Sequence, residues 1–237
     1  MGRFWRVLGV VCVLFIAASE PAAAKYENIR RIGVISAIGD TFAVEKVGLT
    51  VFGNERKEIA TESWKIDDFV IARIRASLAG RFDVRTVNYN RAALLAPNAS
   101  IFASTASKIA DVVRQASPQG LDAYLVVTKG TSAYGTSNQS VTGLGIIDGS
   151  GLIGTNISVF ALYWITLIDG RQFTGLGAAP GPQAGFLVAI HGPSRQVDKS
   201  WWPTVFDAGA NAKLKGVVVE LLGQNLPATL QKLELLK

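Results

Sequence analysis

The feature that most constrains this chain is a short apolar segment near its N-terminus, because it decides the compartment in which the fold must be stable. Residues 7–18 are uncharged and mostly apolar, Arg3 and Arg6 precede them, and alanines occupy positions 22–24. This order is typical of a cleavable secretory signal. A helix of that length covers roughly 18 Å, well short of a hydrocarbon core of ~30 Å, so a retained membrane anchor is the weaker alternative. We therefore expect residues 1–24 to be removed and residues 25–237 to form one periplasmic or secreted domain.

Cys12 lies inside this segment and is the only cysteine of the chain. A lipoprotein signal ends at a cysteine that follows a small residue, whereas here Val11 precedes Cys12 and the apolar run continues beyond it. We therefore expect no lipid anchor. Loss of Cys12 leaves no disulfide, so the domain must depend on a hydrophobic core. The same loss excludes thiol chemistry, and a single histidine, His191, excludes a histidine-rich metal site. We predict no catalytic metal and no cofactor.

The charge of the chain gives no pattern for nucleic-acid binding. Arg3, Arg6 and Glu20 fall in the signal segment, so the net charge of +6 becomes +5 after cleavage. The basic residues are scattered and no run of five occurs, which is typical of a solvated mixed surface. A peripheral contact with the membrane or with peptidoglycan stays open as an alternative.

The first half of the domain alternates between β-type and helical patterns. A helix is predicted over residues 64–78, because Ile66, Val70, Ile74 and Leu78 recur every four residues and form one apolar face. Ser63 is its expected N-cap and Gly80 its expected end. The other expected elements are a hairpin of strands 31–37 and 41–52, a polar loop at 53–62, a strand at 82–87, an irregular segment at 91–100 and a second helix from Phe102 to Val113.

The second half is richer in β-type patterns. Residues 121–129 form a nearly continuous apolar run, which predicts a central strand buried on both faces. The other expected elements are a Gly-rich loop at 130–155, one long strand at 156–169 with a hairpin turn at Asp169-Gly170, and a closing helix that starts near Pro203 and is broken by Pro227.

These elements predict an α/β (or α+β) fold: a single layered domain with a mixed sheet of about five to seven strands and helices packed on it. Four passages, RIGVISA, WKIDDFVIARIRASL with RFDVRTV, LDAYLVVTKG and ALYWITLIDGRQF, cover about half of the mature chain. Their order resembles the periplasmic module of TolB amino-terminal domains, curli-secretion lipoproteins and penicillin-binding-protein activator lipoproteins. Several of these families are non-catalytic, so the resemblance implies an adaptor or assembly role.

The candidate interaction site is a pair of Gly-rich apolar loops. Thr-Gly-Leu-Gly occurs at residues 142–145 and again at 174–177, on either side of the long predicted strand. The first of these loops carries apolar side chains that a solvated loop does not need, and Asp148 is its only charged residue. Such a segment suggests contact with a partner. The rival interpretation is that residues 141–147 form an inner strand. The candidate interaction residues are Leu144, Ile146, Ile147, Leu152, Ile153 and Leu176.

Other motifs are better explained by structure than by catalysis. Residues 149–154 match G-x-G-x-x-G, but a β-type run follows where a dinucleotide site needs a helix. No G-x-S-x-G accompanies His191, and Asp67 and Asp68 point about 100° apart on a helix, so helix-dipole stabilisation suffices for them. Trp201-Trp202 is assigned to burial in preference to glycan binding. The sequence favours a non-enzymatic binding, adaptor or envelope-assembly factor; the alternative is a periplasmic hydrolase with a site near residues 130–154.

We predict cleavage after Ala24, so that amino-terminal sequencing of the exported protein begins Lys25-Tyr26-Glu27. A mature chain that starts at Cys12 and carries a lipid would contradict both the cleavage site and the absence of an anchor.

Overall fold

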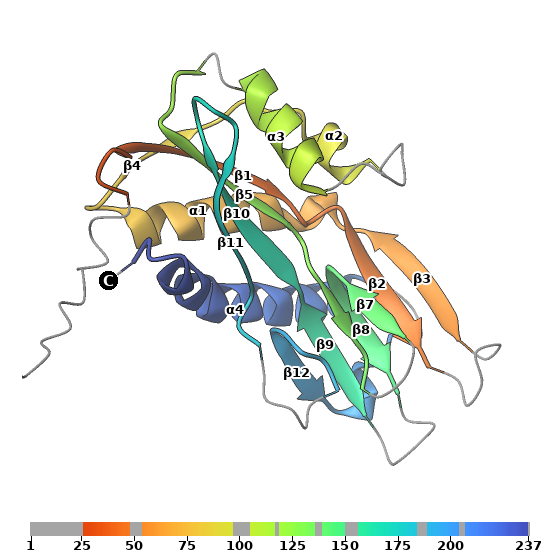
Figure 1. The fold of residues 1–237 in the computed structure, drawn as a ribbon. Helices are drawn as coiled ribbons and strands as arrows, with labels where there is room; N and C mark the ends of the chain where they lie inside the picture. Colours follow the sequence, from red (N-terminus) through yellow and green to blue (C-terminus); the bar gives the residue numbers. More distant parts are fainter. Residues whose placement is uncertain are drawn as a thin grey trace, which may run out of the picture.

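Two mixed β-sheets that share a bent corner form the centre of the computed structural model (Figure 1). The structure describes residues 26–47, 54–96, 105–116, 119–135, 139–149, 156–183, 189–203 and 207–236, so the predicted signal segment lies outside the described residues. Sheet A has the order β11 (Gly175–Pro180), β10 (Tyr163–Asp169), β5 (Ala123–Lys129), β1 (Arg31–Ala37) and β4 (Asp83–Thr86). Sheet B has the order β12 (Ser194–Val197), β9 (Ile157–Ala161), β8 (Leu144–Asp148), β2 (Thr41–Lys46) and β3 (Glu55–Ala60).

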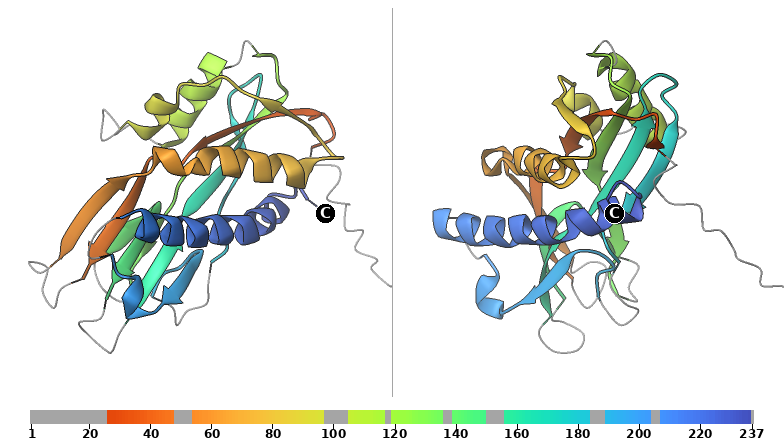
Figure 2. Two further views of the ribbon diagram at one scale, coloured as in Figure 1. Left: turned by 180° about the vertical axis from the view of Figure 1, so that it is seen from behind. Right: turned by 90° about the vertical axis from the view of Figure 1, so that its left-hand side faces the viewer.

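Helices cover both faces of sheet A. Helices α1 (Ile66–Leu78) and α4 (Ala208–Lys232) lie side by side on one face (Figure 2), where the main core joins them to both sheets. Helices α2 (Arg91–Leu95) and α3 (Thr105–Ala116) lie on the other face, over a smaller core. A short hairpin of β6 (Thr131–Ala133) and β7 (Ser140–Thr142) completes the described strands. No helix in the described ranges is long and apolar enough to cross a membrane.

The corner arises because two segments of the chain pass from one sheet into the other. The first leaves β1 and enters β2, and the second leaves β9 and enters β10 through Leu162 alone. Three backbone bonds close a ring here: Gly130 N–H donates to Leu162 O (3.0 Å), Leu162 N–H to Gly143 O (2.7 Å), and Gly143 N–H to Gly130 O (2.9 Å). The polar groups freed by the bend are therefore satisfied. Gly143 has a φ of 70°, which favours glycine.

The fold class and several elements agree with the sequence. The structure is a layered α/β arrangement of mixed sheets and packed helices. The apolar face of α1 is confirmed, since Ile66, Val70, Ile74 and Leu78 are buried, and β5 is a central strand with the helices on either side of it. At the β10–β11 turn the carboxylate of Asp169 accepts hydrogen bonds from two following backbone N–H groups, as expected of a turn aspartate.

Several predicted strand boundaries are wrong. The expected hairpin of 31–37 and 41–52 does not form, because β1 and β2 belong to different sheets and β2 pairs with β3. The expected loop at 53–62 contains β3, whose charged side chains suit an exposed edge strand. The single strand expected at 156–169 is divided into β9 and β10, and the Gly-rich segment 130–155 contains β6, β7 and β8.

The helix ends also differ from expectation. Residues 91–100 include the short helix α2, and Ser63 does not cap α1, which follows Lys65 instead. Helix α4 begins at Ala208, capped by Asp207, and continues through Pro227. A proline cannot bond the carbonyl four residues earlier, that of Gly223. Arg73 of α1 donates to that oxygen at 3.2 Å, which removes much of the penalty.

Gly130→Ala tests the corner. A Cβ atom at this position would lie 2.8 Å from Tyr163 N and 3.0 Å from Tyr163 C, so backbone must shift. We expect a loss of roughly 1–3 kcal/mol in the free energy of unfolding. The matched control is Gly216→Ala, in the exposed middle of α4 with no atom within 4 Å, which should gain about 0.5–1 kcal/mol. Equal effects of the two changes in urea unfolding would show that the corner tolerates a side chain.

Candidate functional site

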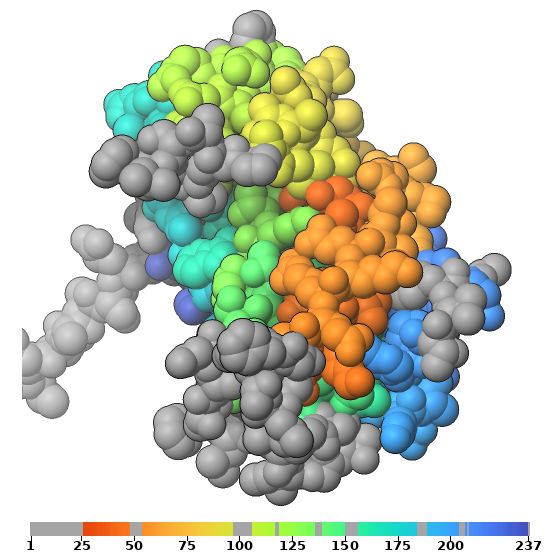
Figure 3. Space-filling view, turned by 90° about the vertical axis from the view of Figure 1, so that its right-hand side faces the viewer, coloured from red at the N-terminus to blue at the C-terminus, as the bar shows by residue number. Residues whose placement is uncertain are grey.

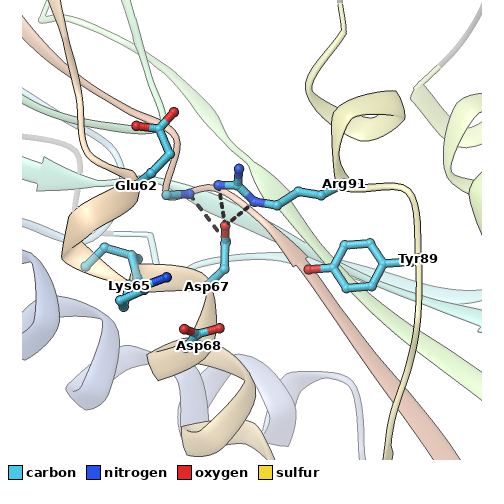
Figure 4. Close-up of a pocket in the computed structure, with 8 residues that line it drawn as sticks. Glu62, Lys65, Asp67, Asp68, Tyr89 and Arg91 are labelled. Carbon is cyan, nitrogen blue, oxygen red and sulfur yellow. Dashed lines mark hydrogen bonds and ion pairs between the residues drawn. The ribbon is translucent and has the colours of Figure 1, made fainter.

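The main candidate site is a cavity of about 210 Å³ where α1 begins, which we call the α1 cleft (Figure 4). Three parts of the chain meet there: the β1–β2 bend, the first turn of α1 with the 3-10 turn Glu62–Trp64 before it, and the segment that leads into α2. The lining residues are Gly39, Glu62, Lys65, Ile66, Asp67, Asp68, Tyr89 and Arg91.

The carboxylate of Asp67 holds these parts together. Its Oδ1 accepts hydrogen bonds from Ser36 Oγ (2.7 Å), Ile38 N–H (2.9 Å) and Gly39 N–H (3.3 Å). Its Oδ2 accepts from Arg91 Nε at 2.8 Å and pairs with Arg91 Nη2 at 2.6 Å. Asp67 is only 9% exposed. Both oxygens are therefore engaged, and the carboxylate acts as a structural clamp.

Local geometry explains how Asp67 reaches the bend. Lys65 adopts a left-handed conformation (φ 56°), which separates the 3-10 turn from α1 and lets the helix begin at Ile66. Trp64 anchors that turn by packing against Phe42 of β2, with ring centroids 5.2 Å apart. Asp67 then lies in the first turn of α1, where the helix dipole also favours negative charge.

Tyr89 and Arg91 complete the wall opposite α1. The hydroxyl of Tyr89 donates to Ser36 O at 2.6 Å, and burial raises the pKa of this phenol. Burial alone would lower the pKa of Arg91, but its hydrogen bond and ion pair with Asp67 outweigh burial, so the pKa of Arg91 lies above its ordinary value. Tyr89 stays neutral and Arg91 stays charged at physiological pH.

The rim of the cleft differs from its interior. Glu62, Lys65 and Asp68 are exposed, and in the described part of the chain no hydrogen bond or ion pair engages their side chains. Figure 4 shows Asp67 directed toward Arg91, whereas Asp68 is turned away from that pair. The sequence predicted that the two aspartates point apart and do not form a carboxylate pair, and their side chains do point apart. The rim presents both signs of charge to a ligand.

The predicted interaction residues are placed differently from the expectation. Leu144, Ile146 and Ile147 lie in β8 and are 1% exposed or less, so their assignment to a solvent loop is wrong. Leu176 lies in β11, partly buried against the main core. Leu152 and Ile153 lie outside the described residues. The inner-strand interpretation of residues 141–147 applies to β8, because alternate side chains of this strand meet cores on both of its faces.

The other motifs contribute little chemistry to the site. His191 is partly buried, and its backbone N–H donates to Ser132 Oγ at 2.9 Å. Trp201 and Trp202 are partly buried against the main core, with Lys213 Nζ 3.7 Å from the Trp201 ring centroid. Most of residues 149–154 lie outside the described part. Within the described ranges, no three Asp, Glu, His or Cys residues are placed to hold a metal ion.

Comparison with known proteins does not assign a family. No protein-family model and no curated protein matches the sequence. Similar solved structures include protein XCC0632 of the DUF330 family from Xanthomonas campestris (7% identity, 87% of this chain and 85% of that chain, TM-score 0.36). Others are a PelC dodecamer from Paraburkholderia phytofirmans (15%, 88% and 91%, 0.31) and lipoprotein GNA1162 from Neisseria meningitidis (14%, 83% and 99%, 0.29). Likenesses this distant carry no functional assignment, and the resemblance to the TolB-type module stays a prediction.

Asp67→Ala tests the clamp. It removes the acceptor for Ser36 Oγ and for the backbone N–H groups of the β1–β2 bend, and it leaves the partly buried Arg91 without its partner. We therefore expect a loss of roughly 3 kcal/mol in the free energy of unfolding. Asp68→Ala is the matched control, because the neighbouring carboxylate is exposed, and should change stability by less than about 0.5 kcal/mol. Urea unfolding monitored by circular dichroism measures both; similar losses would contradict the assigned roles.

Proposed function

We propose that this protein is a non-enzymatic binding or assembly factor of the cell envelope that acts after export, with the α1 cleft as a contact for its partner. The observation that carries the proposal is the contrast between the interior and the rim of the cleft. The central carboxylate, Asp67, is committed to five hydrogen bonds and ion-pair contacts, whereas the rim side chains Glu62, Lys65 and Asp68 form none within the described residues.

A catalytic carboxylate needs an oxygen that can reach a substrate and exchange a proton with it. Asp67 offers neither oxygen, and Ser36 donates its hydroxyl to Asp67. Recognition, in contrast, needs accessible charges held on a rigid base. Glu62, Lys65 and Asp68 project from such a base, since Trp64 and Asp67 fix the turn on which they lie. Opposite charges spaced around one opening favour a partner with charges of both signs, and thus a protein surface.

Site-specific photocrosslinking tests this proposal. A benzophenone amino acid placed at Lys65 should give one adduct of defined mass in intact cells of the native host, because the partner would lie over the cleft. The control position is Lys57, an exposed residue of the charged edge strand β3, which should give no matching adduct. A paired charge reversal, Glu62→Lys with Asp68→Lys, should remove the adduct while the melting temperature is kept. The same adduct pattern from both positions, or no adduct at Lys65, would contradict a partner at the cleft.

A further inference from the structure

The second surface of interest is the outer face of sheet A, which α2 and α3 cover only in part. Outward side chains near the start of β5 and the end of β10, such as Tyr124 and Ile168, are buried beneath α3 in the smaller core. Toward the corner the cover ends. Thr166 is partly buried, and Trp164, four residues from Ile168 on the same face of β10, is 40% exposed.

Where the cover ends, a groove of about 240 Å³ opens between the helices and the sheet. Ala37 of β1 and Thr128 of β5 form its floor, Leu94 and Leu95 of α2 form one wall, and Ile109 of α3 adds to it. Trp164 borders this floor, because it pairs with Thr128 across the β5–β10 ladder and so stands on the same face. Figure 3 shows α2 and α3, in yellow and yellow-green, at the upper end of this side of the molecule, above the orange segments.

Trp164 is the feature of this groove that most needs an explanation. No other large apolar side chain in the described part of the chain is exposed to the same degree. Tryptophan is enriched among the residues that dominate binding energy at protein interfaces, particularly beside a pocket that an apolar anchor can fill. An exposed indole next to a groove with an apolar wall is therefore better suited to a docked partner than to solvent.

The charges around the groove are of one sign. Lys108 of α3 and Lys129 of β5 line it, and none of the described residues that line it carries a carboxylate. Lys129 is paired with Asp40 at 2.6 Å, at the β1–β2 bend. Lys108 donates only to the carbonyl of Ala96, so its charge has no acidic partner in the described ranges. An occupant with an apolar side chain against the wall of Leu94, Leu95 and Ile109 and a carboxylate beside Lys108 would match both properties.

We propose that this groove, bordered by Trp164 and Lys108, docks an acidic and apolar peptide segment of the partner protein. The proposal rests on the proposed function and adds a second contact with a stated chemistry. The occupant is a peptide and not a bilayer, because the groove is recessed between two helices and the sheet, where single side chains can enter and a membrane surface cannot.

The test uses the mature protein with 5-fluorotryptophan, whose Trp164 fluorine resonance is assigned with Trp164→Phe. The probe is a synthetic peptide in which two leucines are flanked by aspartates, and its control replaces each aspartate with lysine. The acidic peptide should shift the Trp164 resonance in a saturable way and leave the other tryptophans unchanged. The lysine peptide should bind at least tenfold more weakly, because Lys108 repels it.

Two variants sharpen the test. Binding to the variants is measured by isothermal titration calorimetry, because Trp164→Ala removes the fluorine probe. Trp164→Ala and Lys108→Glu should each weaken binding of the acidic peptide about tenfold while the melting temperature is kept, and Lys57→Glu on β3 should have no effect. Equal binding of both peptides would overturn the proposal. Trp164 fluorescence that acrylamide does not quench in the protein alone would also overturn it, since the chain itself would then cover the indole. A response to phosphatidylglycerol vesicles in place of the peptide would overturn it as well. Loss of peptide binding with retention of the Lys65 crosslink would reject the groove and leave the proposed function standing.

Discussion

The hydrogen bonds of Asp67 are the interaction on which the rest of this structure depends. They join the first turn of α1 to Ser36 and to two backbone N–H groups of the β1–β2 bend, and the same carboxylate holds Arg91 at the start of α2. A chain passing from one sheet to another leaves backbone donors without ladder partners, and burial makes them costly. Asp67 satisfies two of these donors and at the same time fixes the position of α1 over sheet A.

At the second bend of the corner, the polar backbone groups are satisfied by other backbone groups and not by a side chain. Leu162 leaves β9 and enters β10, and its backbone groups bond to two glycines of neighbouring segments, Gly130 and Gly143. Close approach of backbone to backbone needs residues without a Cβ atom. The two bends place sheets A and B side by side, so that one layer of helices can serve both: α4 contacts β9 of sheet B and β11 of sheet A, and its leucines enter the main core.

The sequence predicts the elements whose environment is local and repetitive. The four-residue spacing of α1 and the apolar run of β5 are decided by burial alone, and both predictions are confirmed. The division of residues 156–169 could not be predicted, because Leu162 continues the apolar pattern and its bend depends on glycines far along the chain. Strand β3 is polar because it lies at an edge, and α4 continues past Pro227 because Arg73 bonds a carbonyl 150 residues away.

The candidate site shows the same limit. Asp67 and Asp68 are adjacent in the sequence and both suit a helix start, so no local pattern distinguishes the clamp from the exposed carboxylate. The distinction comes from Ser36 and Arg91, which are 31 and 24 residues from Asp67. The exposure of Trp164 could not be predicted from its strand pattern either, because it depends on how far α3 covers that face of sheet A.

Helix α2 connects the α1 cleft to the groove beside Trp164. Arg91, its first residue, is held by Asp67 at the cleft, whereas Leu94 and Leu95 at its other end form a wall of the groove. The helix has five residues and none of them is fully buried, so its own packing contributes little to its position. The remaining constraints are the cap of Asn90, which accepts from Ala93 N–H, contacts with α3 and β1, and the Arg91–Asp67 pair. The buried carboxylate that joins α1 to the β1–β2 bend therefore also helps to hold one wall of the groove in place, and the two candidate contacts share the Arg91–Asp67 pair.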